Sequence, residues 1–200
     1  MATLDHLMYS VPDLDSAIIE LTEKTGVVAE YGGAHAGRGT QNALLSLGEG
    51  QYLEIIAPDP KQPLLGTMGE QLLHQPAKLR MWAVATTDLA GIGAIAKRHQ
   101  LNCQPIIDMD RLTTDKTLLT WKIMPISGLR LLPFFIDWLD CDHPSATAPK
   151  GCSLLSFEVI TPEGDNYQRF MNTLGIDVVV SAGEYELRAE IQSPRGRVQL

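Results

Sequence analysis

The feature that most constrains the fold is an internal repeat whose three copies are evenly spaced along the chain. The segment "LDHLMYSVPDL" begins at Leu4, "LRMWAVATTDL" begins at Leu79, and "LLSFEVITPEG" begins at Leu154. Each segment has the pattern of a half-buried strand that runs into the start of a helix. The sequence therefore predicts three related units within one chain.

The residues after each copy predict a helix with defined ends. In the first copy Asp13 or Asp15 is a candidate N-cap, and Gly26 is a candidate C-terminal stop, as Gly175 is in the third. Short β-type runs follow each helix: "NALLSLG" and "QYLEIIAP", then "LLTWKIM" and "LLPFFIDW", and finally "YELRAEIQ" and "GRVQL". The predicted unit is a strand, a helix and two or three strands, used twice in full and once in shortened form.

These elements predict an α+β fold in a single domain that spans residues 1–200. Proline-flanked or Pro- and Ser-rich stretches separate the units, and the first of these stretches is expected to hold a short helix. The predicted modules are residues 1–58, 79–140 and 152–200 (partial), with linkers at 59–78 and 141–151.

Composition narrows the function classes. The 200 residues are 44% hydrophobic and carry a net charge of -8, so a protein that grips nucleic-acid phosphates is not expected. The N-terminus has no basic leader, and no apolar run approaches the roughly 20 residues that span a bilayer. Three cysteines without a CxxC pair fit reduced thiols. We expect a cytoplasmic protein with neither a nucleic-acid nor a membrane partner.

The repeated modules, together with "GGAHAGRGTQN" and "YLEIIAPDP", resemble the vicinal oxygen chelate superfamily, which includes glyoxalase I, extradiol dioxygenases and antibiotic-resistance proteins. Within it, the chain is most similar to the glyoxalase-like domain proteins. The resemblance implies βαβββ modules that form a curved mixed sheet around a cavity. It also implies a divalent metal (Mn, Fe, Co, Ni or Zn) held by residues of the first and last strands of a module. In the first module these positions are His6 and Glu54, which are also the predicted catalytic residues.

The other modules depart from that pattern. When the copies are aligned at the spacing of the repeat, His6 corresponds to Met81. Glu54 corresponds to Phe135 in "LLPFFIDW". The third copy offers Ser156 and Gln199. Several alternatives stay open: His35, Asn42 or Asp137 completes a metal site, a second subunit of a homodimer does so, or the cavity binds no metal. Without metal, a hydrogen bond between the histidine and the glutamate could make His6 a general base.

Other polar and aromatic residues are candidate substrate ligands. Glycines surround His35, Arg38 and Asn42, and they permit close approach of the backbone to a ligand. Arg38 could fix an anionic or carbonyl oxygen, or it could simply pair with Glu54. An aromatic wall from the second module would suit an apolar molecule, although core packing also explains its members, which are Trp82, Phe134, Phe135 and Trp138.

Two further stretches are interpreted as structural. The stretch "MDRLTTDKT", with Asp108 just before it, lacks the glycine and the terminal glutamate of a calcium loop, so it is predicted to be a solvated hairpin edge. Cys141 and His143 stand beside a proline in a loop and are not predicted metal ligands.

The sequence thus predicts a small-molecule enzyme of the glyoxalase and dioxygenase superfamily. Its substrate would carry vicinal oxygen atoms, as a dicarbonyl, a hydroxy-carbonyl or a catechol does. The alternative is a metal-free protein that binds or sequesters an apolar or aromatic molecule. The missing second pair of ligands favours this alternative, and the isolated carboxylate of Glu54 favours the enzyme.

Overall fold

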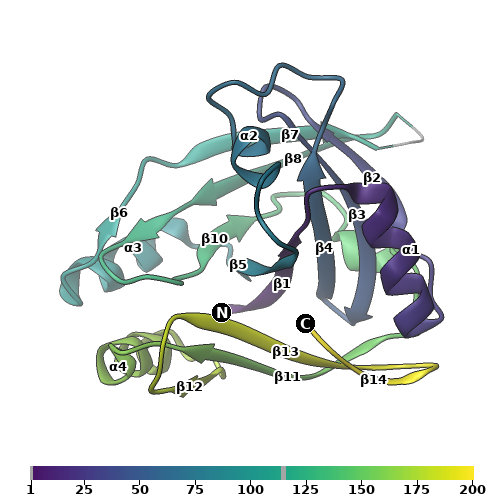
Figure 1. Ribbon diagram of the computed structural model, residues 1–200. Helices are drawn as coiled ribbons and strands as arrows, with labels where there is room; N and C mark the ends of the chain where they lie inside the picture. Colours follow the sequence, from purple (N-terminus) through teal and green to yellow (C-terminus); the bar gives the residue numbers. More distant parts are fainter. Residues whose placement is uncertain (1, 114–115) are drawn as a thin grey trace.

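The computed structural model describes residues 2–113 and 116–200 (Figure 1). The first unit consists of β1 (Thr3–Ser10), α1 (Leu14–Thr25), β2 (Glu30–His35), β3 (Thr40–Gly48) and β4 (Gln51–Pro58). The second consists of β5 (Lys78–Ala85), α3 (Leu89–Arg98), β6 (Asn102–Cys103), β7 (Ile107–Leu112), β8 (Leu118–Met124), β9 (Ile126–Ser127) and β10 (Phe134–Asp137). The third consists of β11 (Ser153–Ile160), α4 (Gly164–Leu174), β12 (Val179–Ser181), β13 (Glu186–Ser193) and β14 (Gly196–Gln199).

The first strand and the helix of each unit begin at the same even spacing, so the predicted copies at Leu4, Leu79 and Leu154 are confirmed as strands that lead into helices. The first linker holds the short helix α2 (Met68–Leu72), and the second holds the 3-10 helix η1 (Pro144–Ala146).

The helix ends follow from local chemistry. The side chain of Asp13 accepts a hydrogen bond from the Ser16 backbone N–H, and Asp88 does the same for Gly91 in the second unit. Gly26 ends α1 in the left-handed conformation, with a φ of 77°. Among the described residues, no helix has the length and apolar content needed to cross a membrane.

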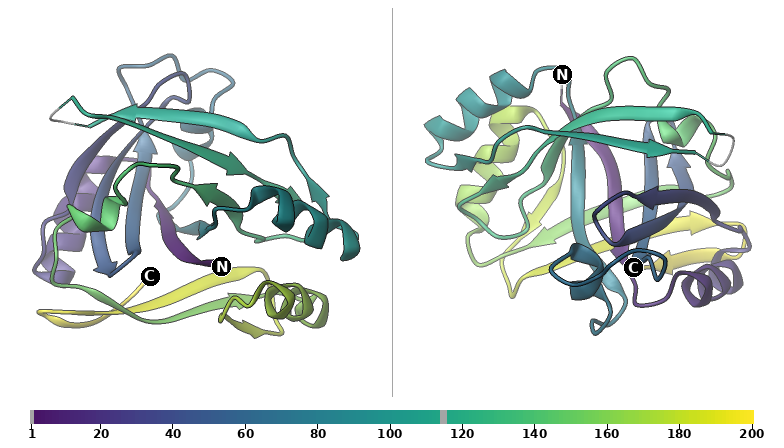
Figure 2. Two further views of the ribbon diagram at one scale, coloured as in Figure 1. Left: turned by 180° about the vertical axis from the view of Figure 1, so that it is seen from behind. Right: turned by 90° about the horizontal axis from the view of Figure 1, so that it is seen from above.

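The first and second units share one eight-stranded mixed sheet, in the order β2-β3-β4-β1-β5-β10-β8-β7. In both units the first strand pairs in parallel with the last, β1 with β4 and β5 with β10. The sheet curves until its two edge strands, β2 and β7, come into contact (Figure 2). The predicted curved mixed sheet is confirmed.

The third unit keeps the order of elements but not the pairing. Its four strands form a separate sheet in the order β12-β11-β13-β14, in which β11 pairs in parallel with the strand directly after its helix. Two of these strands are short, with three residues in β12 and four in β14. This sheet lies across one side of the curved sheet (Figures 1 and 2). The main apolar core lies between the two sheets and their helices.

One irregularity in β1 sets the positions of Asp5 and His6. The pairing of β1 with β5 shifts between Leu4 and His6, so Asp5 is an extra residue, as in a β-bulge. Leu4 and Leu7 therefore both pack against the main core. Asp5 and His6, although adjacent in sequence, turn toward each other, and their side chains are hydrogen-bonded. Strict alternation would place Leu4 on the same face as His6, and the bulge removes that relation.

Candidate active site

A cavity of about 510 Å³ opens on the concave face of the eight-stranded sheet. Every second residue of β4 faces it, namely Tyr52, Glu54 and Ile56, as the alternation predicts. Its walls are mainly apolar and include Met8, Ile56, Met68, Met81, Met109, Trp121, Ile123, Phe134, Ile136 and Trp138. Its polar lining includes His6, His35, Arg38, Thr40, Asn42, Glu54 and Arg111. The cavity can therefore enclose a molecule with an apolar body and a polar end.

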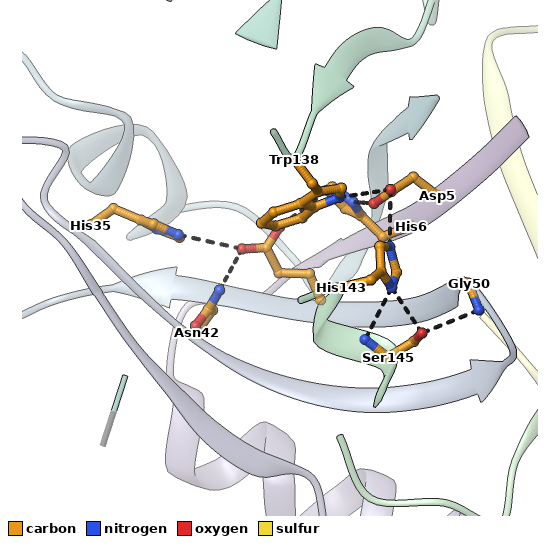
Figure 3. Close-up of polar contacts among 9 residues, drawn as sticks. Asp5, His6, His35, Asn42, Gly50, Trp138, His143 and Ser145 are labelled. Atoms are coloured by element: carbon orange, nitrogen blue, oxygen red, sulfur yellow. Dashed lines mark hydrogen bonds and ion pairs between the residues drawn. The ribbon is translucent and has the colours of Figure 1, made fainter. Parts of the chain in front are cut away.

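Glu54 lies at the centre of the polar group and is only 5% exposed. Its Oε1 accepts a hydrogen bond of 2.7 Å from the Asn42 amide, and its Oε2 lies 3.6 Å from His6 Nε2. The Nε2 of His35 lies 3.7 Å from Oε1 (Figure 3). The structure therefore brings together four residues that the sequence singled out: His6, His35, Asn42 and Glu54.

Asp5 fixes the orientation of His6. Asp5 Oδ1 lies 2.5 Å from His6 Nδ1, and Oδ2 receives hydrogen bonds from Trp138 Nε1 at 2.9 Å and His143 Nε2 at 3.0 Å (Figure 3). Burial alone would raise the pKa of Asp5, but the hydrogen bonds and charge interactions with His143 and His6 outweigh it and hold this pKa well below its ordinary value. An ionised carboxylate only accepts hydrogen bonds, so the His6 Nδ1 carries a proton and donates it.

The ring of His6 is held on three sides. Its Nδ1 is occupied by Asp5, Tyr52 stacks on it at 4.6 Å between ring centroids, and Phe134 meets it edge-on at 5.5 Å. With Nδ1 bonded to Asp5, Nε2 is the ring nitrogen that points toward Glu54 and the cavity. In the tautomer with its proton on Nδ1, this atom has a lone pair and can accept a proton from a bound molecule.

His143 supports Asp5. The backbone N–H of Ser145 donates to His143 Nδ1 at 3.1 Å, so the opposite nitrogen carries the proton that reaches Asp5. Sequence reasoning missed Asp5 and gave His143 no role. The one available signal was the pair of adjacent polar residues in an otherwise apolar strand, because the bulge that unites them has no clear signature in one sequence.

Arg111 was missed for a different reason. The hairpin of β7 and β8 was predicted to be a solvated edge, yet Arg111 is 5% exposed and lines the cavity, so that prediction is wrong for this residue. Curvature of the sheet brings β7 against β2, which covers the arginine. Its Nη1 donates to Asn42 Oδ1 at 3.2 Å. The amide nitrogen of Asn42 is therefore directed toward Glu54, to which it donates. Asp115, in the same predicted hairpin, lies outside the described residues.

The pair Gly32 and Gly33 makes this contact feasible. A Cβ on Gly32 would overlap Arg111 Nη1, and a Cβ on Gly33 would lie 2.8 Å from the backbone oxygen of Leu112. Gly33 also has a φ of 134°, which residues with a side chain rarely adopt. The glycine pair lets the two edges of the curved sheet approach with Arg111 between them.

His35 and Arg38 take different places. His35 is buried beside Thr40, and burial lowers its pKa, partly opposed by the carboxylate of Glu54. Arg38 is exposed at the rim of the cavity, where its Nη2 lies 3.4 Å from Met109 Sδ. Arg38 therefore does not form the suggested ion pair with Glu54.

The prediction that Trp82 and Phe135 line the cavity is wrong. Both are fully buried in the main core, and Trp82 donates its indole N–H to the Leu131 carbonyl at 2.9 Å. Their neighbours Met81 and Phe134 face the cavity instead. The strand registers explain the error: Met8 pairs with Glu54 and Ala83 pairs with Phe134, so the counterpart of Glu54 is Phe134, one residue before the predicted one.

The residues of the site do not make a complete metal ligand set. His6 Nε2 and Glu54 Oε2 are close enough to approach one ion, since each ligand lies at about 2 Å from a first-row metal. However, residues 2–113 and 116–200 contain no group of three or more His, Cys, Asp or Glu side chains arranged to hold one. Met81 and Phe134 stand where the second unit would supply donors, and Asp137 does not line the cavity. The predicted metal on His6 and Glu54 stays a prediction.

A curved sheet built from two βαβββ units around a cavity defines the vicinal oxygen chelate class of proteins. The family model described as "Glyoxalase-like domain" matches residues 4–175, so the chain belongs to that family. A comparison with curated proteins found no match.

Solved structures share the fold. A hypothetical protein from Staphylococcus aureus is 17% identical, with a TM-score of 0.68, over 100% of this chain and 85% of that chain. A variant of the methylmalonyl-CoA epimerase of Streptomyces coelicolor, in complex with 2-nitronate-propionyl-CoA, is 15% identical, with a TM-score of 0.50, over 70% of this chain and 97% of that one. A hypothetical protein from Bacillus halodurans is 9% identical, with a TM-score of 0.51 and the same two coverages. At these identities the likeness establishes the fold alone.

Proposed function

We propose that the protein is an enzyme that moves a proton on a small molecule with vicinal oxygen atoms, such as a hydroxy-carbonyl compound. The observation that carries this proposal is the His6 ring, which Asp5 holds with its Nε2 lone pair 3.6 Å from Glu54 Oε2 inside an apolar cavity. A histidine oriented by a buried carboxylate is an arrangement that enzymes use for general acid-base catalysis.

The shape of the cavity supports a substrate with an apolar body. The methionines Met8, Met68, Met81 and Met109 line its walls together with aromatic rings. Methionine side chains are flexible and polarizable, so they adapt to irregular apolar ligands. The polar residues gather around Glu54, which favours binding of the oxygen atoms of the substrate at that end.

In the proposed reaction, His6 Nε2 removes a proton from a carbon next to a carbonyl group. The carboxylate of Asp5 stabilises the imidazolium that forms, because the two groups are already hydrogen-bonded. Glu54 Oε2, 3.6 Å from Nε2, then takes this proton from the imidazolium and returns it to another atom of the enolate that has formed, while Asn42 keeps the carboxylate in place. His35 and Arg38 would contact the oxygen atoms of the substrate. An isomerase, an epimerase or a lyase could use this step.

Hydrogen exchange tests the proposal whatever the final product is. The protein is incubated in D₂O with a panel of hydroxy-ketones and 2-oxo acids, and loss of the C–H signal next to the carbonyl is followed by NMR. We expect exchange of at least one compound with the wild type, and a rate lower by a factor of about 100 or more in His6→Gln and Glu54→Gln.

His99→Gln is the matched control, because the His99 side chain is hydrogen-bonded to Thr173 and does not line the cavity. This variant should catalyse exchange at the wild-type rate. Exchange that is equally fast in the wild type and in the two site variants, or absent for every compound, would contradict the proposal.

The second candidate function is the sequestering of an apolar or aromatic molecule. Met81 and Phe134 favour it, because the second unit contributes only apolar side chains at the positions that correspond to His6 and Glu54. Mass spectrometry of small molecules extracted from the purified protein tests this function. An apolar compound at near-equal molar amount, together with no exchange, would support it over the enzyme.

A further inference from the structure

We propose that Arg111 is the residue that selects the substrate, and that the substrate is an anion whose carboxylate lies next to the reacting carbon. The inference rests on the proposed function and deepens it, although an anionic ligand could also bind at Arg111 without reacting. It starts from the burial of the Arg111 guanidinium at the end of the cavity where Glu54 lies.

A buried guanidinium requires compensation. The cost of removing a full charge from water is large, so buried arginines normally pair with carboxylates or phosphates. Among the described residues, no carboxylate lies within 4 Å of the Arg111 guanidinium, and its hydrogen bond to a side chain is the one to Asn42. A guanidinium has five N–H donors in a planar fork, which fits a carboxylate well.

The surroundings of Arg111 fix where the anion would lie. Its stem packs along Gly33 and its Nη1 reaches Gly32 and Asn42, so the head group is held in place by the edges of the curved sheet. Asn42 connects the guanidinium to Glu54, which in turn faces His6. A carboxylate bound by Arg111 would therefore stand close to the proposed proton-transfer pair, while the apolar part of the same molecule extends along the methionines and Trp121.

Arg38 is the competing residue for the same role. It also lines the cavity, and the sequence predicted that it could bind an anionic oxygen. Arg38, however, is exposed at the rim, where water weakens its interaction with an anion. A different alternative gives Arg111 a purely structural role, in which its charge balances Glu54 through Asn42.

A matched pair of ligands separates these alternatives. The probes are phenylglyoxylate, a 2-oxo acid with an apolar ring, and its methyl ester, which has the same shape around the ketone without the charge. Neither has a hydrogen on the carbon next to the ketone that His6 could remove, so binding is measured apart from the reaction. The side-chain Nε–H signal of Arg111 is followed by NMR on ¹⁵N-labelled protein, and the affinities come from the same titrations.

We expect the acid to bind the wild type at least about tenfold more tightly than the ester, because only the acid can form a charge-assisted hydrogen bond with the guanidinium. The acid should also shift the Arg111 Nε–H signal. This preference should vanish in Arg111→Met and be retained in part in Arg111→Lys. In Arg38→Met and His6→Gln the ratio of the two affinities should persist, even where these variants weaken the binding of both probes. Thermal unfolding checks that each variant is folded. If Arg111→Met is not folded, a reduced preference in Arg111→Lys tests the proposal in its place.

Equal affinity for acid and ester in the wild type, or no binding of the acid, would overturn the proposal and leave Arg111 as a structural residue. Loss of the preference in Arg38→Met with retention in Arg111→Met would assign the anion to the rim arginine, which also overturns it. Retained preference in His6→Gln supports the role of Arg111 even if no compound undergoes exchange, so the two proposals fail separately.

Discussion

The first and second units of the curved sheet have the same order of elements but opposite chemistry at corresponding positions. His6 corresponds to Met81, Glu54 to Phe134, and Asp5 to Arg80, which stands directly before Met81 as Asp5 stands before His6. The first unit gathers buried, hydrogen-bonded polar groups, whereas the second lines the same cavity mainly with sulfur and aromatic atoms. One backbone plan thus provides a polar end and an apolar wall.

This contrast indicates that the repeat preserves strand pairing rather than ligands. The parallel pairing of β1 with β4 and of β5 with β10 depends on backbone hydrogen bonds and on apolar residues of the opposite face. Side chains that face the cavity are free to differ between the units. Arg111 is the exception in the second unit, because it reaches the polar end across the contact between β7 and β2.

The largest difference between the two units should be in the loss of kcat/KM on substitution. His6→Gln and Glu54→Gln should lower kcat/KM by a factor of about 100 or more, because each removes a group that carries the proton. Met81→Leu and Phe134→Leu change only packing, and they should lower it by less than about tenfold. The measurement uses whichever compound shows hydrogen exchange. Similar losses in all four variants would break the division between the units.

Asp5 should contribute more to stability than its counterpart. Asp5→Asn should lower the free energy of unfolding by about 3 kcal/mol at pH 7, because three donors lose a buried carboxylate. The folded-state pKa of Asp5 is depressed, so its contribution is present above the unfolded-state pKa of about 3.9 and is lost as the pH falls through that value toward the folded-state pKa.

Urea unfolding at several pH values checks this prediction. The difference between wild type and Asp5→Asn should shrink as the pH is lowered below about 4. Arg80→Met is the control from the second unit, since Arg80 is half-buried and its guanidinium donates to the backbone oxygen of Pro76 rather than to a carboxylate. A difference that stays constant with pH would show that the Asp5 carboxylate is not preferentially stabilised in the folded protein.

Glycine substitutions should have opposite signs in the two units. Gly32→Ala should lower the free energy of unfolding by about 2 kcal/mol, because the new Cβ collides with Arg111 and Asn42. Gly93→Ala, inside α3, should raise it by about 0.5 to 1 kcal/mol, since the nearest atom outside its own helix is Cys103 Sγ at 3.8 Å. Chemical denaturation measures both, and a neutral Gly32→Ala would mean that the contact of β2 with β7 is loose.

Small effects of equal size in both units are expected at the helix starts. Asp13→Ala and Asp88→Ala should each lower the free energy of unfolding by about 1 kcal/mol, because each removes a side-chain cap. These equivalent positions should respond alike, in contrast to those that face the cavity. If the two losses differ from each other by more than about 1 kcal/mol, the units differ in their scaffold as well.

Much of the fold could be predicted from the sequence because each copy of the repeat contains the same strand and helix start. The even spacing of the copies located the strands at Leu4, Leu79 and Leu154, and His6 and Glu54 followed from the matching family positions. The pairing of the third unit could not be predicted, because the same order of elements permits two sheet arrangements. Asp5 and Arg111 were hidden as well, since one depends on a β-bulge and the other on closure of the sheet. Trp82 and Phe135 were misplaced by a single step in register.

The most direct test of the proposed reaction is ¹⁵N NMR of the His6 ring, with its signals assigned by their loss in His6→Gln. The reaction requires a protonated Nδ1 bonded to Asp5 and a bare Nε2 that faces Glu54. We predict that the wild type holds this tautomer and that Asp5→Asn no longer favours it over the tautomer with the proton on Nε2. A proton on Nε2 with a bare Nδ1, or an Nε2 bound to a metal that copurifies with the protein, would contradict the proposed reaction.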